Sequence, residues 1–326
     1  MTKTKRNAII EYMEQKKGRV VKIRQFLYTS ASFFYLRITA NQRLKPRKRL
    51  RFETDVTDHC NLNCKSCHHF SSIADQNFVE TEVFEKDFAR ISQLAGRNNE
   101  NIDIMGGEPL LHPEISTLLI IARKYFDGPV NIVTNGILLE KMNAFFWESC
   151  RKNNIRIIVS SYPIKLNVKR IKELAKKYSV TLKIRSIFMS KNSWCKLPFD
   201  LNGKQCIKEN SKLCITINKC IFLKNGRLST CCLPLVADRF NNYFCKNTET
   251  VTVSSRTGNF AHSGLVVSTA LEATDDDSID IYKAKNIGEI YEFLSKPVPF
   301  CRYCKIKSWE IGIEWGVSKK EITEWI

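Results

Sequence analysis

Two hydrophobic periodicities alternate along the chain from residue 51 to about residue 190. Short strand-like runs cover 51–57, 101–105, 130–133, 155–159 and 182–187. Between them apolar residues recur at helical spacing, as in Val83, Phe84, Phe88, Ile91, Leu94 and Ala95. Strands that alternate with amphipathic helices predict a parallel sheet covered by helices. We therefore predict an α/β fold with five strands before residue 190.

The alternation stops after residue 192, where cysteines become frequent, at positions 195, 206, 214, 220, 231, 232 and 245. Residues 241–280 are polar and predict an insertion or mobile loop. A last amphipathic segment, 287–294, leads to Cys301-Arg-Tyr-Cys304. We therefore expect three parts: an arm over 1–50, a core domain over 51–195, and a cysteine-rich domain over 196–326 with a polar insertion near 241–280.

Positive charge is concentrated at the start of the chain. Residues 1–51 hold fifteen Lys and Arg against two Glu, which is +13 of the total net charge of +19. Apolar residues among them favour a helical arm that packs on the core. The alternative is an arm that binds an anionic membrane surface or an acidic partner protein. No nucleic-acid-binding motif is visible, so we expect no specific nucleic acid.

The thirteen cysteines indicate metal ligation more than disulfides. No run of eighteen apolar residues and no secretory leader is visible, so we expect a cytoplasmic protein, in which disulfides are rare. Cys60, Cys64 and Cys67 lie within eight residues, directly after the first predicted strand. Three thiolates in one short loop leave a metal centre with an open coordination position. The alternative is structural zinc with His59, His68 or His69 as fourth ligand.

The cysteine spacing, with Gly106-Gly107-Glu108-Pro109 and Thr134-Asn135-Gly136 after later strands, resembles the radical S-adenosylmethionine (SAM) enzymes. The resemblance implies a partial (β/α)6 TIM-type barrel, which needs one strand more than the five counted. It implies a [4Fe–4S] cluster on the three cysteines, with SAM on its open iron, and a one-electron reductant such as flavodoxin or ferredoxin. Gly106, Gly107, Glu108 and Pro109 would then bind SAM, with Glu108 facing its ammonium, and Asn135, Ser160 and Ser161 would contact its carboxylate and ribose. Ser66 stands where the family usually has an aromatic, so adenine packing would fall to Phe70 or a histidine.

A second metal site is expected in the C-terminal part. Asn225-Gly226 between apolar runs predicts a type I′ β-hairpin, which would place Cys220 opposite Cys231. Cys301 and Cys304 supply a second chelating pair. The four resemble the ligands of the twitch or shortened SPASM extension of radical SAM enzymes, which holds an auxiliary [4Fe–4S] cluster. Cys214 could replace Cys220 and Cys232 could replace Cys231, and a zinc site is the alternative.

These features lead to a functional expectation. We expect a radical SAM oxidoreductase that cleaves SAM to a 5′-deoxyadenosyl radical and oxidises or rearranges a sugar- or cyclitol-type small molecule, helped by the auxiliary cluster. One alternative is a radical SAM maturase acting on a ribosomally made peptide. An alternative of another class is a non-catalytic metal-binding scaffold.

Overall fold

The structure is a computed structural model that describes residue 44 and residues 49–186, 193–219, 221–245 and 270–326. The predictions for the basic arm and for Cys220 concern residues outside this set. Of the expected polar insertion near 241–280, residues 246–269 also lie outside it. On its two sides the chain is regular. Residues 241–244 end helix α7 (Leu233–Phe244), and the 3-10 turn Asp275–Asp277 is followed by strand β9 (Ile279–Asp280).

Strands and helices alternate through the first half, as predicted. Most residues of these strands are buried, on both faces of the sheet, which is typical of a parallel sheet covered on both sides. Asn143 and Asn167 cap the helices α4 and α5 by accepting hydrogen bonds from Phe146 N and Arg170 N. The elements are β1 (Arg51–Thr57), α2 (Thr81–Ala95), β2 (Asn101–Gly106), α3 (Ile115–Tyr125), β3 (Val130–Thr134), α4 (Ala144–Lys152), β4 (Ile155–Ser161), α5 (Val168–Lys177) and β5 (Leu182–Ser186).

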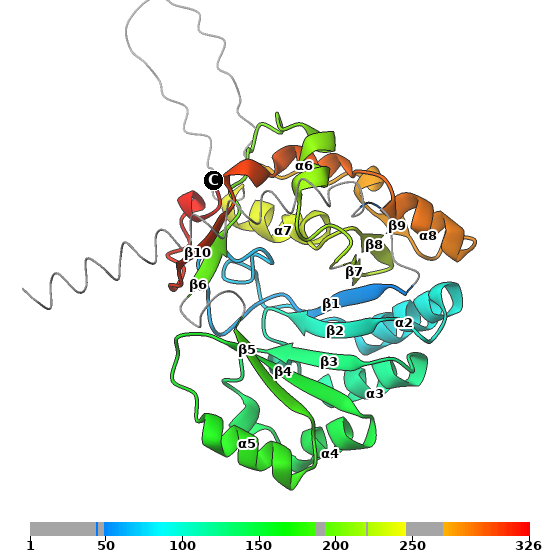
Figure 1. The fold of residues 1–326 in the computed structure, drawn as a ribbon, viewed down its shortest axis with the longest axis vertical. Coiled ribbons are helices and arrows are strands. Elements are labelled where there is room, and N and C mark those ends of the chain that lie inside the picture. Colours follow the sequence, from blue (N-terminus) through cyan, green and yellow to red (C-terminus); the bar gives the residue numbers. More distant parts are fainter. Residues whose placement is uncertain (1–43, 45–48, 187–192, 220, 246–269) are drawn as a thin grey trace, which may run out of the picture.

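The main sheet has the order β5-β4-β3-β2-β1-β7-β8-β9. Strands β1 to β5 pair in parallel, and helices α2 to α5 lie along their outer side (Figure 1). A sixth parallel strand is present, but it is β7 (Ile221–Lys224), which pairs with β1. It lies beyond β1 and not beyond β5, so the described sheet is open and does not close into a barrel.

The predicted hairpin is confirmed. Asn225 and Gly226 both have positive φ, 49° and 72°, as a type I′ turn requires. Lys224 pairs with Arg227, and the antiparallel ladder continues to Phe222 opposite Ser229. Strand β8 (Arg227–Ser229) then pairs with β9 (Ile279–Asp280). The C-terminal part therefore extends the sheet of the N-terminal part.

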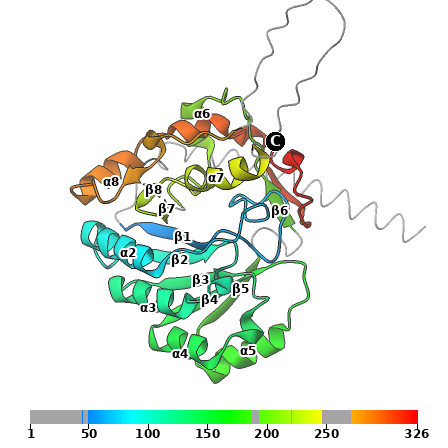
Figure 2. The same cartoon turned by 180° about the vertical axis from the view of Figure 1, so that it is seen from behind.

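The rest of the C-terminal part packs beside β1, and helix α8 (Ile287–Leu294) contributes Ile290 and Leu294 to the main hydrophobic core. Figure 2 shows helices α6, α7 and α8 on the side of β1 away from α3 and α4. A second hydrophobic core forms there, around Phe199, Phe240 and Trp325. No helix among the described residues is long and apolar enough to cross a membrane. The remaining elements are β6 (Ser193–Lys196), α6 (Ile207–Leu213), α7 (Leu233–Phe244), α8 (Ile287–Leu294) and β10 (Glu310–Glu314), which pairs with β6 in a separate two-stranded sheet.

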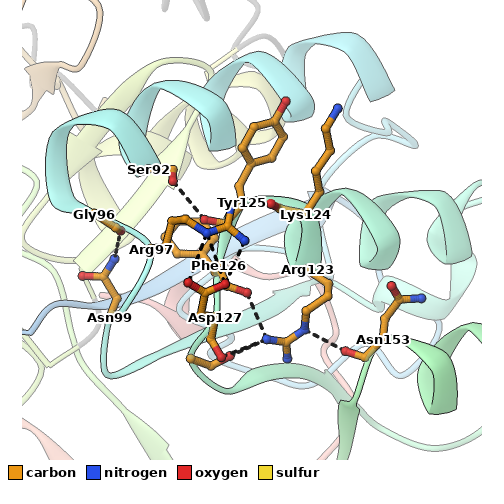
Figure 3. Close-up of polar contacts among 11 residues, drawn as sticks. Ser92, Gly96, Arg97, Asn99, Arg123, Lys124, Tyr125, Phe126, Asp127 and Asn153 are labelled. Atoms are coloured by element: carbon orange, nitrogen blue, oxygen red, sulfur yellow. Dashed lines mark hydrogen bonds and ion pairs between the residues drawn. The ribbon is translucent and has the colours of Figure 1, made fainter.

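Charged side chains fix the loops at the amino-terminal edge of the sheet. Arg97 donates to both carboxylate oxygens of Asp127 and to the carbonyl of Lys124, which joins the loop after α2 to the loop after α3 (Figure 3). Arg123 donates to the carbonyls of Asp127 and Asn153, so α3 is also joined to the end of α4. These contacts fix the positions of α2, α3 and α4 relative to one another, and they lie far from the strands' carboxyl ends.

Candidate functional site

The loop after β1 brings its three cysteines to one cavity. Asn63 and Ser66 take positive φ values of 52° and 53°, which winds the loop tightly enough for Cys60, Cys64 and Cys67 to line the same space. The cavity has a volume of about 500 Å³. Asparagine tolerates this conformation better than most residues. The loop is thus shaped to present three sulfur ligands to one centre.

The thiols of Cys60, Cys64 and Cys67 have raised pKa values, so they would ionise only with a bound cation. Burial raises the pKa of Cys60 to about 12 and raises the pKa of Cys64 and of Cys67 above the usual range. For each of Cys60 and Cys64, the negative charge of Cys67 adds to the effect. Metal ligation deprotonates thiols that burial keeps protonated. Three buried thiols on one cavity therefore fit a metal centre.

The kind of metal centre stays a prediction. Within the described residues, no three His, Cys, Asp or Glu side chains are placed to hold a single metal ion. In a cubane cluster each thiolate binds a different iron, whereas zinc takes all its ligands on one ion. Structural zinc is therefore still the alternative to a cluster at Cys60, Cys64 and Cys67.

The two glycines after β2 dock this strand onto the cysteine loop. A Cβ on Gly106 would lie 2.4 Å from the carbonyl oxygen of Thr57, and one on Gly107 would lie 1.9 Å from that of His59. Gly107 N and Glu108 N donate to these same oxygens, at 2.9 and 3.2 Å. Both glycines line the cavity. The close approach that requires glycine is thus to the backbone leading into the loop; their predicted contact with SAM stays a prediction.

Glu108 lies beneath the cavity and does not line it. Its fully buried carboxylate accepts hydrogen bonds from Leu110 N at 3.1 Å, Thr134 Oγ1 at 2.5 Å and Asn135 N at 2.8 Å. Burial raises its pKa to about 7, although these three donors favour the ionised form. The carboxylate joins the ends of β2 and β3, and its predicted pairing with an ammonium stays a prediction. Pro109 is also buried, at the start of the 3-10 turn Pro109–Leu111.

Of the polar residues predicted after β3 and β4, two line the cavity. Asn135 donates to Asn61 Oδ1 at 2.7 Å, and its Nδ2 lies 3.9 Å from Cys60 Sγ. Ser160 also lines the cavity, whereas Ser161 does not. Asn135 therefore contacts the cysteine loop and also lines the cavity, so a molecule bound at the loop would lie next to it. The roles assigned to these residues by resemblance remain predictions.

The aromatic surroundings differ from the expectation for Phe70. Phe70 is completely buried in the second core, against Phe199 and Phe240, and does not line the cavity. The alternative is a histidine: His68 and His69 line the cavity, whereas His59 does not. Sequence reasoning missed three further aromatic residues on its wall, which come from distant segments without a spacing pattern: Tyr162, Trp194 and Trp309.

A buried charge network supports the loop from below. Arg239 of α7 donates to Asp55 Oδ2 at 2.8 Å, to the carbonyl of His69 at 2.8 Å and to Asp58 Oδ1 at 2.5 Å. Asp55 Oδ2 also lies 3.0 Å from His69 Nδ1. Burial alone would raise the pKa of Asp55, but the positive charges of His69 and Arg239 outweigh it and hold the pKa below its usual range. Sequence patterns gave no sign of this network, because Arg239 lies 184 residues from Asp55.

The far wall of the cavity is polar and charged. Arg51 and Glu53 from β1 and Arg185 from β5 line it. Arg51 Nη2 lies 2.6 Å from Asp103 Oδ2 and 3.5 Å from Glu53 Oε1. A polar group of a ligand therefore finds both cations and a carboxylate opposite the cysteine loop.

Four cysteines of the C-terminal part line a second cavity, in the alternative set that has Cys214 in place of Cys220. Cys214, Cys231, Cys301 and Cys304 line a separate, largely apolar cavity of about 20 Å³. Burial raises the pKa of Cys301 to about 12 and raises the pKa of Cys231 and of Cys304 well above the usual range. A negative charge on Cys214 would raise the pKa of all three thiols as well. Cys214, which directly follows α6, is the alternative named for Cys220 and lines this cavity. Cys220 itself lies outside the described residues, so the choice between the two stays a prediction.

The two cavities share a wall. Leu197, Thr216, Cys231 and Leu233 line both of them. Cys232 lines only the larger one. Cys231 is therefore the one sulfur of the second set that the described residues place on both cavities.

The other cysteines fall into distinct environments. Cys195 lines the larger cavity, with its Sγ 3.8 Å from His68 Nε2. Cys150 is buried in the core, as expected for an apolar helix face, and Cys206 is exposed. None of these three lines the smaller cavity.

Comparison with known proteins supports this site. Residues 54–151 match the model of the radical SAM superfamily. The chain is 41% identical over 88 residues to the GTP 3′,8-cyclase of Chlorobaculum tepidum and 32% identical over 95 residues to the 7,8-dihydro-6-hydroxymethylpterin dimethyltransferase of Methanocaldococcus jannaschii. These matches cover 26% and 27% of this chain, and 26% and 18% of the relatives.

A solved structure shows a weaker likeness over more of the chain. BtrN in complex with AdoMet and 2-DOIA matches with a TM-score of 0.45 and 14% identity, over 80% of this chain and 94% of that chain. A score and an identity this low say nothing about the reaction. The family assignment rests on residues 54–151, which contain the cysteine loop, both glycines and Glu108. Over residues 54–151 the chain is therefore similar to the radical SAM superfamily.

Proposed function

We propose that this chain is a radical SAM oxidoreductase with two [4Fe–4S] clusters. Cys60, Cys64 and Cys67 would hold the first, and its open iron would bind SAM. When bound, this pair supplies one-electron cleavage of the sulfonium and a 5′-deoxyadenosyl radical that abstracts hydrogen from the substrate. The chain itself orients the ligands and excludes water. Gly106, Gly107, Asn135 and Ser160 are the predicted SAM contacts that line the cavity.

Cys214, Cys231, Cys301 and Cys304 would hold the second cluster. With four protein ligands it has no open position, so it suits electron transfer and not SAM binding. The observation that carries this proposal is the position of Cys231, which lines both cavities. Cys231 would thus hold the second cluster at the wall of the larger cavity, and this cluster would supply an electron acceptor there. This arrangement favours an oxidation over a redox-neutral rearrangement.

The substrate proposed is a polar small molecule of the sugar or cyclitol type. The charged wall formed by Arg51, Glu53 and Arg185 offers both donors and acceptors, which suits a polyhydroxylated or amino-substituted ligand. The GTP and pterin named for the relatives are not carried over to this chain, because the matches cover only 26% and 27% of it. A peptide substrate remains the alternative within the same chemistry.

The partners are proposals as well. A one-electron reductant such as flavodoxin or ferredoxin would supply the electron for SAM cleavage. The basic arm would serve docking to an anionic surface or an acidic partner. The alternative of a non-catalytic scaffold predicts no SAM cleavage under any conditions.

The two-cluster proposal is tested with Cys301→Ala/Cys304→Ala. Anaerobically reconstituted wild type should hold about eight iron atoms and the variant about four. With dithionite and SAM, the variant should still release 5′-deoxyadenosine, because the cluster at Cys60, Cys64 and Cys67 is intact. Circular dichroism must first show a native fold, since metal ligation is also folding energy. Unchanged iron content in a folded variant would refute the second site, and absence of 5′-deoxyadenosine from wild type would favour the scaffold.

A further inference from the structure

We propose that Trp315 tunes the cluster loop through a hydrogen bond to sulfur. The indole Nε1 of Trp315 donates to Cys64 Sγ at 3.1 Å. This is a short distance for an acceptor as large as sulfur. The inference rests on the proposed cluster at Cys60, Cys64 and Cys67, and concerns the redox potential of that cluster.

The chain is built to bring this indole to the loop. Trp315 directly follows β10, which pairs antiparallel with β6. The register shifts between Ile311 and Ile313, where Gly312 has a φ of 86°. A bulge with a glycine in this conformation bends a strand and redirects the side chains beyond it. The strand therefore arrives over the cysteine loop, 251 residues away in sequence.

Backbone contacts then fasten the segment after β10 across the loop. Lys65 N donates to the carbonyl of Gly316 at 2.9 Å, and Ser318 N donates to that of Asn63 at 2.7 Å. Cys64 forms an isolated antiparallel bridge with Val317. These bonds bracket Cys64 on both sides, so the indole donor is held in place by main chain and not by a flexible side chain alone.

The ring of Trp315 is also fixed by packing. It contacts a small hydrophobic cluster that contains Leu62, Cys64 and Trp194. Its centroid lies 6.2 Å from that of Tyr162. Trp194 in turn donates its Nε1 to the carbonyl of Lys65 at 2.6 Å. A donor held in an apolar environment interacts more strongly with a charged acceptor than one exposed to water.

A second tryptophan provides a contrast within the same loop. Trp325 Nε1 donates to the carbonyl oxygen of Cys67 at 3.0 Å, and Ser66 Oγ donates to that of Glu324 at 2.7 Å. These contacts fasten the loop without touching sulfur. Trp325 is 1% exposed, so its removal should disturb packing at least as much as removal of Trp315. It serves as a matched control.

The expected consequence follows from the charge of the acceptor. A reduced cluster carries one more negative charge than an oxidised one, so a hydrogen bond to a ligating sulfur stabilises the reduced form. Loss of the bond should make reduction harder. We expect Trp315→Phe to shift the equilibrium of the SAM-responsive cluster about tenfold towards the oxidised form, which for one electron corresponds to about 59 mV.

The experiment is a redox titration of the reconstituted full-length holoprotein, followed by electron paramagnetic resonance. The cluster is identified in wild type as the signal that changes when SAM is added. Trp315→Phe should move its midpoint to a more negative potential at unchanged iron content, whereas Trp325→Phe should leave the midpoint near that of wild type. Equal midpoints in wild type and Trp315→Phe, or equal shifts in both variants, would overturn the inference.

A measurement without a variant covers the case in which Trp315→Phe loses its cluster. Wild-type protein labelled with ¹⁵N at its tryptophan indoles should show ¹⁵N coupling to the SAM-responsive signal in pulsed resonance spectra. Absence of this coupling would overturn the inference. Absence of any SAM-responsive signal in wild type would instead contradict the proposed function, so the two failures are distinguishable.

Discussion

The guanidinium of Arg239 joins α7 to the start of the cysteine loop, and we predict that Arg239→Met destabilises the fold strongly. The Arg239 side chain is 3% exposed and that of Asp55 is fully buried. Methionine keeps the length of the side chain but leaves Asp55 and Asp58 without their shared cation. Removing one partner of a buried ion pair costs about 3–5 kcal/mol. For a chain of this size the loss should lower the Tm by about 6–10 °C.

The effect should depend on pH in a defined direction. Burial alone would raise the pKa of Asp58 as well, but the charges of Arg239 and Lys224 lower it, as the charges of His69 and Arg239 do for Asp55. A carboxyl group with a lowered folded pKa contributes stability that is present above its unfolded pKa, about 4, and is lost as pH falls through the folded value. The difference between wild type and variant should therefore be full at pH 7 and shrink as pH falls below about 4.

The assay is thermal unfolding, monitored by circular dichroism. It uses holoprotein at pH 7, and cluster-free protein for the pH series because acid removes iron–sulfur clusters. Arg97→Met is the matched control. It removes an arginine that bonds the carboxylate of Asp127 and a carbonyl, but on the surface, with both side chains about half exposed (Figure 3). The control should lower the Tm much less. Equal losses in the two variants, or a loss in Arg239→Met that does not change with pH, would refute the reasoning.

Three further predictions follow from the site. Cys214→Ala should lower the iron content of reconstituted protein by up to about half. Cys206→Ala, which replaces an exposed cysteine, should leave it unchanged, and equal iron content in the two variants would contradict the proposed ligand set. Gly107→Ala should reduce iron incorporation, because its Cβ would lie 1.9 Å from a backbone oxygen, whereas Gly316→Ala, with 3.4 Å to the nearest side-chain atom, should be tolerated. Burial raises the pKa of Glu108 from 4.5 to about 7, so the Tm of wild type minus the Tm of Glu108→Gln should fall as pH rises through this range. A difference in Tm that grows with pH would contradict this prediction.

Local patterns were sufficient to predict the alternating half of the fold. The helical spacing through Phe84, Phe88 and Ile91 corresponds to the buried face of α2. Asn225-Gly226 predicted its turn, because few residues other than these adopt two successive positive φ values. Spacing also predicted that three cysteines face one space, since they lie on one short loop. In each case the interacting residues are close in sequence.

What the sequence could not supply are contacts between distant segments. The sixth parallel strand, β7, pairs with β1, and nothing local to 221–224 specifies which strand it joins. The position of Cys214 beside Cys301 and Cys304 depends on how α6 packs against 299–303. Phe70 is an aromatic residue next to the cysteine loop, but its backbone φ of 53° accompanies a side chain turned into the second core. Tertiary packing decided each of these outcomes.

The central claim is that Cys60, Cys64 and Cys67 hold a cluster that cleaves SAM. Its most direct test compares wild type with Cys60→Ala/Cys64→Ala/Cys67→Ala, both reconstituted anaerobically, for iron content and for 5′-deoxyadenosine formed with dithionite and SAM. We predict about eight iron atoms in wild type and about four in the variant, with 5′-deoxyadenosine formed by wild type alone. Stoichiometric zinc without iron in anaerobically purified wild type, or 5′-deoxyadenosine formed equally by both proteins, would contradict the account.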